Sequence, residues 1–270
     1  MTKPVKDEIF GTRRSILKNY LKFHLYENLF LATCIKRFNP NPDSRYLLLR
    51  ECFDEKAFND DSLKELRPFF RDSLKLGNCW FHQNKILLRS LQLDKVEEFT
   101  HSTQLATFLL KVLHCNGKEE LKHSTAVVPE SEDVTPLSRF LRQELFGRVA
   151  STDIDFMIVN KEKKSLTLVE EKLYTQTGGS IGQGQYLSFR EIVLDVLKNT
   201  SDPGINFFLV CFPNQDTEHC YVYNFLQEVE KEARQPSYFD PRRQEQRIII
   251  PFSEMTKMTV QQLIGEWILA

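Results

Sequence analysis

The sequence contains no apolar run that approaches the roughly 20 residues needed to cross a membrane as a helix. No signal-peptide pattern opens the chain, and no repeat or low-complexity segment interrupts it. An excess of positive charge is also missing, because 36 lysines and arginines face 37 aspartates and glutamates. These absences exclude a uniformly basic nucleic-acid binder, so any basic surface has to be local. We expect a soluble, cytoplasmic protein.

None of the six cysteines belongs to a Cys-x-x-Cys pair. Residues 79–82 and 114–115 come nearest to zinc-ligand spacing, but neither segment has a matching second half. We therefore predict that the cysteines are buried, reduced thiols. The sequence also shows no helix-turn-helix, no zinc finger and no phosphate-binding P-loop. Because these common binding motifs are absent, none of them indicates the function of the chain.

Composition supports a substantial core, with 41% hydrophobic and 11% aromatic residues. A chain of 270 residues can hold one large domain or two small ones. We expect a helix-rich region at residues 1–128, for DNA recognition or dimerisation, and a catalytic domain at residues 129–270. The acidic, proline-bearing stretch 129–133 is the candidate linker.

Three helices are expected in the first region. The longest covers residues 13–37, before the Asn-Pro-Asn-Pro run that starts at Asn39. Apolar residues surround much of this helix, which suits a dimer interface. Shorter helices are expected near residues 61–74 and 102–114. The polar and aromatic segment 80–85 can contact bases, although such a segment more often only packs its tryptophan.

The most informative pattern is a β-hairpin that begins at Asp155. An apolar strand follows this aspartate, and after a polar turn a second apolar strand ends in Glu170, Glu171 and Lys172. Because strand side chains alternate between faces, Glu170 and Lys172 share one face. The hairpin brings Asp155 to the same end of the sheet. Two carboxylates there can hold a hard divalent cation, and an ammonium beside them can steady charge on a phosphate.

These residues resemble the catalytic motif of the PD-(D/E)xK nuclease superfamily, which includes most type II restriction endonucleases. Asp155 and the Glu-Glu-Lys run that ends at Lys172 carry the match. The chain departs from the superfamily name, because Thr152-Asp153 or Ile154-Asp155 stands where Pro-Asp would. Asp153 is therefore the alternative to Asp155. Another interpretation needs no nuclease, since an exposed hairpin edge can carry charges merely to discourage aggregation.

The resemblance implies an α/β, restriction-endonuclease-like fold, in which helices flank a mixed β-sheet. It also implies hydrolysis of DNA phosphodiester bonds with Mg²⁺, for which Mn²⁺ can substitute. Asp155 and Glu170 would ligate the metal together with the backbone carbonyl of Glu171. Lys172 would position the attacking water and stabilise the developing charge. The expected partner is double-stranded DNA, cut by a homodimer.

Two helices beside the hairpin supply further candidates. Thr135 and the proline after it begin a predicted helix, whose apolar face includes Leu137 and, seven residues later, Glu144. By resemblance Glu144 would be a further metal ligand, and the alternative is a boundary residue paired with a nearby cation. The second helix carries Gln185 on its inner face. The resemblance gives Gln185 the task of orienting the attacking water or a phosphate.

Four of the 10 glycines lie in residues 177–185, where we expect a loop that either approaches a ligand closely or moves. A strand at residues 205–212 has a nearly continuous apolar run, which suits a sheet covered on both faces. Further strands are expected at residues 220–223 and 247–251, and a helix begins at Thr259 with a capping box. This order predicts an α/β sandwich around a mixed sheet.

Three functions are compatible with these patterns. Chain length and motif favour a type II restriction endonuclease. A repair or recombination nuclease that acts on DNA ends or junctions is the alternative, although its Gln-x-x-x-Tyr signature is incomplete, since Phe189 stands four residues after Gln185. A catalytically silent interaction module of the same fold is the third, and the intact acids and lysine oppose it.

Overall fold

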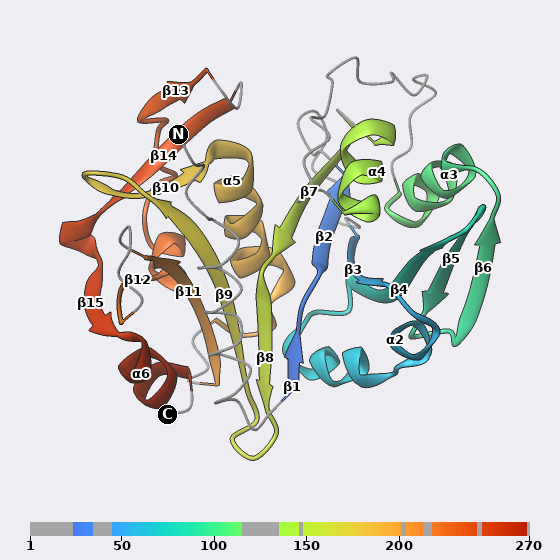
Figure 1. The fold of residues 1–270 in the computed structure, drawn as a ribbon, viewed down its shortest axis with the longest axis horizontal. Helices are drawn as coiled ribbons and strands as arrows, with labels where there is room; N and C mark the ends of the chain where they lie inside the picture. The colour runs from blue at the N-terminus through green and yellow to red at the C-terminus, as the bar shows by residue number, and fades with distance from the viewer. Residues whose placement is uncertain are drawn as a thin grey trace, which may run out of the picture. The chain divides into compact units, whose positions relative to one another are not determined.

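The structure is a computed structural model, and it describes residues 24–34, 45–114, 135–145, 148–200, 204–212, 218–241 and 245–268. The chain divides into two compact units, each with its own mixed β-sheet (Figure 1). The expected junction at residues 128 and 129 lies outside the described residues. Within the described ranges, no helix is both long and apolar enough to span a membrane.

The six-stranded unit combines Glu27–Ile154 with Ser188–Lys198. Its sheet has the order β6-β5-β4-β3-β2-β7, in which only the β3–β4 pair is parallel. Helices α3 and α4 share one apolar core with this sheet. The elements are β2 (Leu29–Cys34), β3 (Tyr46–Cys52), α2 (Glu55–Asn59), the 3-10 helix η1 (Ser62–Phe69), β4 (Leu74–His82), β5 (Lys85–Ser90), β6 (Lys95–Phe99), α3 (Ser102–Val112), α4 (Pro136–Glu144), β7 (Val149–Ile154) and the π-helix η2 (Ile192–Val196).

The expected helix at residues 13–37 is wrong wherever the structure describes it, because His24–Tyr26 and Leu29–Cys34 are strands. A short apolar run is compatible both with a strand that is buried on its two faces and with a buried helix. Near residues 61–74 only the short η1 forms, and β4 follows it at Leu74. The third helix is confirmed by α3. The expectation of a helix-rich N-terminal region is therefore wrong for the described residues, which are mostly strands.

The nine-stranded unit combines Met1–Tyr26, Asp155–Leu187 and Asn199–Ala270. Its main strand order is β13-β14-β10-β9-β11-β12-β15, and β8 pairs with both β9 and β1. The elements are β1 (His24–Tyr26), β8 (Phe156–Asn160), β9 (Ser165–Tyr174), β10 (Gly178–Gly182), the first part of α5 (Gln183–Glu191), β11 (Ile205–Cys211), β12 (His219–Asn224), the 3-10 helix η3 (Phe225–Val229), β13 (Tyr238–Asp240), β14 (Glu245–Pro251), the 3-10 helix η4 (Phe252–Glu254), β15 (Thr256–Thr259), α6 (Val260–Gln262) and the π-helix η5 (Leu263–Ile268).

Most local predictions for this part of the chain are confirmed. The hairpin is formed by β8 and β9, and the apolar strand β11 lies between β9 and β12. Thr135 begins α4, and its hydroxyl accepts a hydrogen bond from the Ser138 N–H at 3.3 Å. The capping box of Thr259 and Gln262 is present at the start of α6. Four cysteines are buried free thiols, as expected: Cys52, Cys79, Cys211 and Cys220.

The glycine-rich segment is a strand, so the predicted loop at residues 177–185 is wrong. Strand β10 pairs with β14 on one side and with the end of β9 on the other, and all its residues are buried. A Cβ atom on Gly178 would lie 2.1 Å from the carbonyl oxygen of Ile250. Glycine is required here by close packing of neighbouring strands, not by motion or a ligand.

The two faces of the nine-stranded sheet have different partners. One face packs against α6 and η5 in an apolar core that includes Val169 and Phe208. The opposite face carries Glu170, which is level with Leu209 on the parallel neighbour β11. Because β9 alternates its side chains, Lys172 and Tyr174 also belong to this second face.

Candidate functional site

The candidate site lies where β9 changes its neighbour along one edge. Strand β8 pairs with β9 as far as Val169, whereas β10 pairs with it only from Leu173 onward. The opposite edge pairs with β11 without interruption through Lys172. On the first edge, the backbone of residues 170–172 therefore has no strand partner in the described sheet. Its hydrogen bonds have to be made by other groups.

Asp155 occupies this gap, in a bend immediately before β8. Its backbone N–H donates to Glu170 Oε2 at 3.1 Å, and its Oδ2 accepts a hydrogen bond from the N–H of Glu171 at 2.8 Å. The two contacts hold the Asp155 and Glu170 carboxyl groups at one end of the hairpin. The predicted convergence of these two acids is therefore seen in the structure.

Glu170, Lys172 and Gln185 form a closed ring of polar contacts. Lys172 Nζ contacts Glu170 Oε1 and also donates to Gln185 Oε1 at 2.8 Å. Gln185 Nε2 donates to Glu170 Oε1 at 2.9 Å. The contacts confirm that Glu170 and Lys172 share one face of β9, and that α5 directs Gln185 toward them.

Water is nearly excluded from the Glu170–Lys172 pair, because the side chain of Glu170 is 3% exposed and that of Lys172 10% exposed. Transferring two charges from water into a protein interior costs several kcal/mol for each ion, which their attraction offsets only with good geometry. A buried ion pair is therefore weak evidence for stability. Desolvated and specifically paired charges are typical of functional sites.

Cys211 is a candidate nucleophile beside the site, since it pairs with Lys172 across the β9–β11 ladder. Burial raises the pKa of its thiol to about 12, and the nearby Lys172 ammonium lowers this pKa only in part. The thiol therefore stays protonated at neutral pH and is a poor nucleophile. The chemistry of the site has to come from its carboxylates, ammonium and amide.

The donor set suits a hard divalent cation. Two carboxylates, from Asp155 and Glu170, lie beside the backbone of Glu171, and Mg²⁺ binds through one or two carboxylates while it keeps several waters. In the described part of the chain, no cluster of three or more histidine, cysteine, aspartate or glutamate side chains is found. A cation at this site would rely on the two carboxylates, backbone oxygen and water.

Glu144, the other predicted ligand, belongs to the six-stranded unit. It lies in the last turn of α4, and its Oε1 accepts a hydrogen bond from the hydroxyl of Ser102 at 2.8 Å. The apolar face predicted for α4 is confirmed, because Leu137, Phe140 and Leu141 are buried. A metal-binding role for Glu144 remains a prediction.

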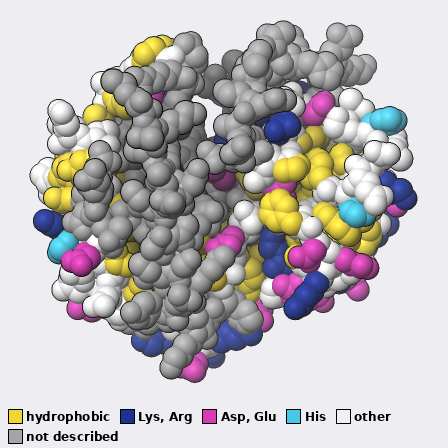
Figure 2. Space-filling view, viewed as in Figure 1, with side chains coloured by type: hydrophobic (Ala, Val, Ile, Leu, Met, Phe, Trp, Pro, Cys, Tyr) yellow, Lys and Arg dark blue, Asp and Glu magenta, His cyan; other side chains and the backbone are white. Residues whose placement is uncertain are grey.

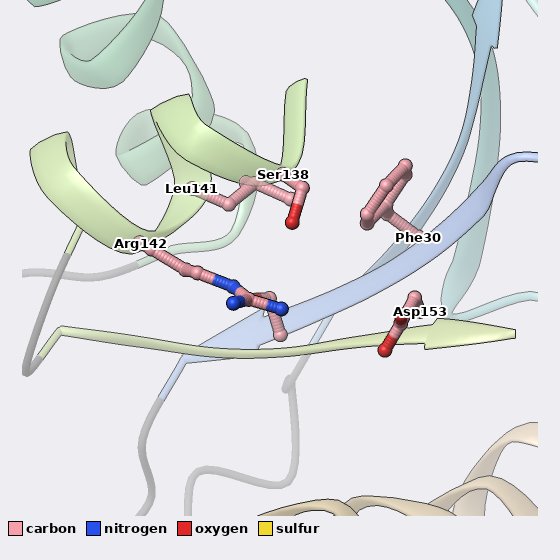
Figure 3. A pocket seen from close by; sticks show the side chains of 6 residues that line it. Phe30, Ser138, Leu141, Arg142 and Asp153 are labelled. Carbon is pink, nitrogen blue, oxygen red and sulfur yellow. The ribbon is translucent and has the colours of Figure 1, made fainter. Parts of the chain in front are cut away.

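Asp153, the alternative to Asp155, is exposed on β7. It lies at a pocket between α4 and two strands of the six-stranded unit, where Arg142 reaches from the helix toward β7 (Figure 3). Asp155 is instead bonded to the backbone of Glu171. The geometry therefore favours Asp155 as the partner of Glu170. The pocket is lined by Phe30, Ser138, Leu141, Arg142, Ser151 and Asp153.

The sequence patterns did not reveal how α5 is anchored. Tyr186, the residue after Gln185, donates its hydroxyl proton to Glu228 Oε2 at 2.5 Å, and Glu228 is fully buried. Burial raises the pKa of Glu228, but hydrogen bonds from Arg234, Tyr186 and Tyr223 outweigh this and leave the pKa below its ordinary value. An ionised Glu228 thus fixes the turn of α5 that carries Gln185. Only the fold joins these residues.

Comparisons with known proteins give no relative for this chain: neither protein-family models, nor curated proteins, nor solved structures match it. The case for a function therefore rests on the site itself.

Proposed function

We propose that this chain is a metal-dependent endodeoxyribonuclease that hydrolyses DNA phosphodiester bonds at Asp155, Glu170, Lys172 and Gln185. The observation that carries the proposal is the buried Glu170–Lys172 pair, hydrogen-bonded to Gln185 and lying beside Asp155, at the point where β9 changes partner. The resemblance to the PD-(D/E)xK motif adds the substrate class.

Each side chain has a role that follows from its chemistry. Asp155 and Glu170 would supply carboxylate oxygens for Mg²⁺ or Mn²⁺, and the resemblance adds the backbone carbonyl of Glu171, the residue after Glu170. A bound divalent cation supplies charge stabilisation and lowers the pKa of water. Lys172 holds the attacking water and stabilises negative charge on the phosphate. Gln185 orients Lys172 and Glu170, to both of which it is hydrogen-bonded.

The role within DNA metabolism is a separate proposal. A type II restriction endonuclease that acts as a homodimer on double-stranded DNA follows from the motif and the chain length. Charge does not decide this choice, because the formal net charge is -1 and, among the described residues on the face in Figure 2, acidic and basic side chains are interspersed. A nuclease for DNA ends or junctions is the second candidate, and an aromatic cluster beside Lys172, described below, favours it. A catalytically silent module would not need the buried ion pair.

The test of hydrolysis compares Asp155, which belongs to the site, with Asp153, which is exposed outside it. Asp155→Asn keeps an acceptor for the Glu171 N–H but removes one carboxylate charge. We expect cleavage of plasmid DNA in Mg²⁺ to fall at least about 100-fold, since a metal contributes several kcal/mol of charge stabilisation. Asp153→Asn, two residues earlier and exposed, is the matched control and should cut at the wild-type rate.

Metal dependence is measured in the same assay. Cutting should stop in excess chelator and return with Mg²⁺ or Mn²⁺, whereas Ca²⁺, with its looser and higher coordination, should bind without turnover. Glu171→Gln should cause a smaller loss than Glu170→Gln, because only its backbone belongs to the site. Full activity in chelator, or equal loss in the two aspartate variants, would contradict the proposal.

A further inference from the structure

We propose that the aromatic cluster of Tyr174, Tyr221 and Phe252 binds one unpaired nucleobase of the DNA substrate, next to the phosphate held at Lys172. This inference rests on the proposed nuclease function for the identity of the ligand. The binding step itself can be measured without cleavage. The base would be unpaired in the substrate, as at an end, or turned out of the duplex on binding.

The three rings form one connected cluster drawn from three elements of the nine-stranded unit. The centroid of the Phe252 ring lies 4.4 Å from that of Tyr221 and 5.0 Å from that of Tyr174. The Tyr174 and Tyr221 centroids are 6.4 Å apart. Tyr174 is 36% exposed although it ends a strand of the sheet interior, so its ring is available to solvent.

The cluster continues the candidate active site along the sheet. Tyr174 is two residues beyond Lys172 on the same face of β9, which corresponds to about 7 Å at the rise of a strand. In the other direction, Lys172 is level with Cys211 on β11, and Cys211 is level with Tyr221 on β12. The ring contact of Tyr174 with Tyr221 confirms that both side chains lie on this face.

Positive charge borders the cluster on the side away from Lys172. Lys257 pairs with Tyr221 across β12 and β15, and it is exposed. An aromatic cluster that exposes Tyr174 and has an ammonium at each side matches a ligand with flat rings on an anionic backbone. Proteins hold single-stranded nucleic acid with this combination of stacking side chains and cations.

Beside Tyr174 the sheet surface is closed by apolar side chains. A Cβ atom on Gly179, which pairs with Tyr174, would lie 2.4 Å from the Cys211 sulfur and 3.0 Å from the terminal methyl carbon of Met255. These two side chains therefore cover Gly179, which is buried. A base would stack on the exposed part of Tyr174, next to this apolar surface.

Direct stacking is read from the fluorescence of 2-aminopurine, which is quenched when this base stacks on an aromatic ring. The probe is a short single-stranded oligodeoxynucleotide with one central 2-aminopurine, titrated with the full-length protein in chelator, so that no cleavage interferes. We expect quenching and saturable binding. The same base paired within a duplex should be bound more weakly.

Variants then locate the stacking residue. Tyr174→Leu should weaken binding by about 5- to 150-fold, the range expected for loss of one base–aromatic stack, and should remove the quenching. Tyr174→Phe should retain both, because the ring and not the hydroxyl stacks. Phe239→Leu changes another exposed aromatic residue, 48% exposed on β13, and should behave as the wild type does.

A second measurement needs no variant. An oligodeoxynucleotide with a single 5-iododeoxyuridine is photo-crosslinked to the wild-type protein, and the modified residue is identified by mass spectrometry. Attachment to Tyr174, Tyr221 or Phe252 supports the proposal, whereas attachment confined to other residues overturns it. Unchanged quenching in Tyr174→Leu also overturns it, even if the protein cleaves DNA. Quenching that depends on Tyr174 in a protein that never cleaves DNA supports base binding and refutes the hydrolysis proposed above.

Discussion

At the scale of single residues, the buried Glu170–Lys172 ion pair governs both the proposed chemistry and the stability of the site. Lys172 Nζ contacts both Glu170 and Gln185. The side chains of Lys172 and Glu170 are almost inaccessible to water. Neither charge can be removed alone without leaving the other in a poorly solvated position. Loss of activity in a Lys172 variant therefore has to be separated from loss of folding.

A double-mutant cycle makes this separation. Lys172→Met should lower the free energy of unfolding by about 3–5 kcal/mol, because it leaves a buried carboxylate without its cation. Adding Glu170→Gln removes that carboxylate charge and should recover most of the loss, while activity stays absent. Urea denaturation measures each variant, with Lys161→Met in the exposed hairpin turn as the control, expected within about 0.5 kcal/mol of wild type. Glu170→Gln alone completes the cycle, and a loss in the double variant equal to the sum of the two single losses would show that the pair is not energetically coupled.

At the scale of elements, the packing of β10 determines where α5 begins and therefore where Gln185 lies in the candidate site. Its glycines let β14 and β9 approach closely, and α5, which carries Gln185, begins directly after it. A strand of ordinary residues would not fit between these neighbours, because a Cβ atom on Gly178 would overlap the backbone of β14. The position of Gln185 thus depends on the packing of β10.

Gly178→Ala tests this dependence. The added methyl group meets the Ile250 carbonyl, so the strands have to separate, and we expect a loss of about 1–3 kcal/mol in the free energy of unfolding. Gly265→Ala is the matched control, since a Cβ atom there meets nothing within 4 Å. Alanine at position 265, in η5, should stabilise the protein by about 0.5–1 kcal/mol. Thermal and urea unfolding report both changes, and a neutral Gly178→Ala would refute the close approach of β10 and β14.

At the scale of the whole molecule, the proposed restriction role requires one copy of the site for each of two DNA strands. The long helix expected as a dimer interface is replaced by β1 and β2 where residues 24–34 are described. The homodimer is therefore supported only by the resemblance to restriction endonucleases. A two-fold dimer would present two copies of the Asp155–Glu170 site to the two strands and read a palindrome through matching half-sites.

Digestion of plasmids of known sequence, with light scattering on the protein, tests this assembly. We expect a homodimer and discrete fragments that map to one short palindromic sequence. A monomer that degrades linear DNA from its ends would contradict the restriction role and leave the hydrolytic site intact. Such a result would agree with the second candidate, a nuclease for ends or junctions.

The sequence alone determined the features that depend on local rules. Alternation along a strand placed Glu170 and Lys172 on one face, and the residues that favour helix starts located α4 and α6. These rules operate over a few residues, so no distant neighbour was needed. The same alternation placed Tyr174 beside Lys172, a signal readable before the fold was known.

Only the tertiary structure decided the features that depend on distant neighbours. Residues 29–34 are strand because other strands cover them, which an apolar run cannot reveal. Residues 178–182 are strand because they pair with β14 and β9, whereas glycine in isolation favours a loop. Residue 178 is glycine because the backbone of β14 lies too close for a Cβ atom. The anchoring of α5 by Glu228 and the joining of Tyr174 to Tyr221 and Phe252 likewise need contacts between separate elements. Such contacts leave no periodic trace in a sequence, because their spacing along the chain is arbitrary.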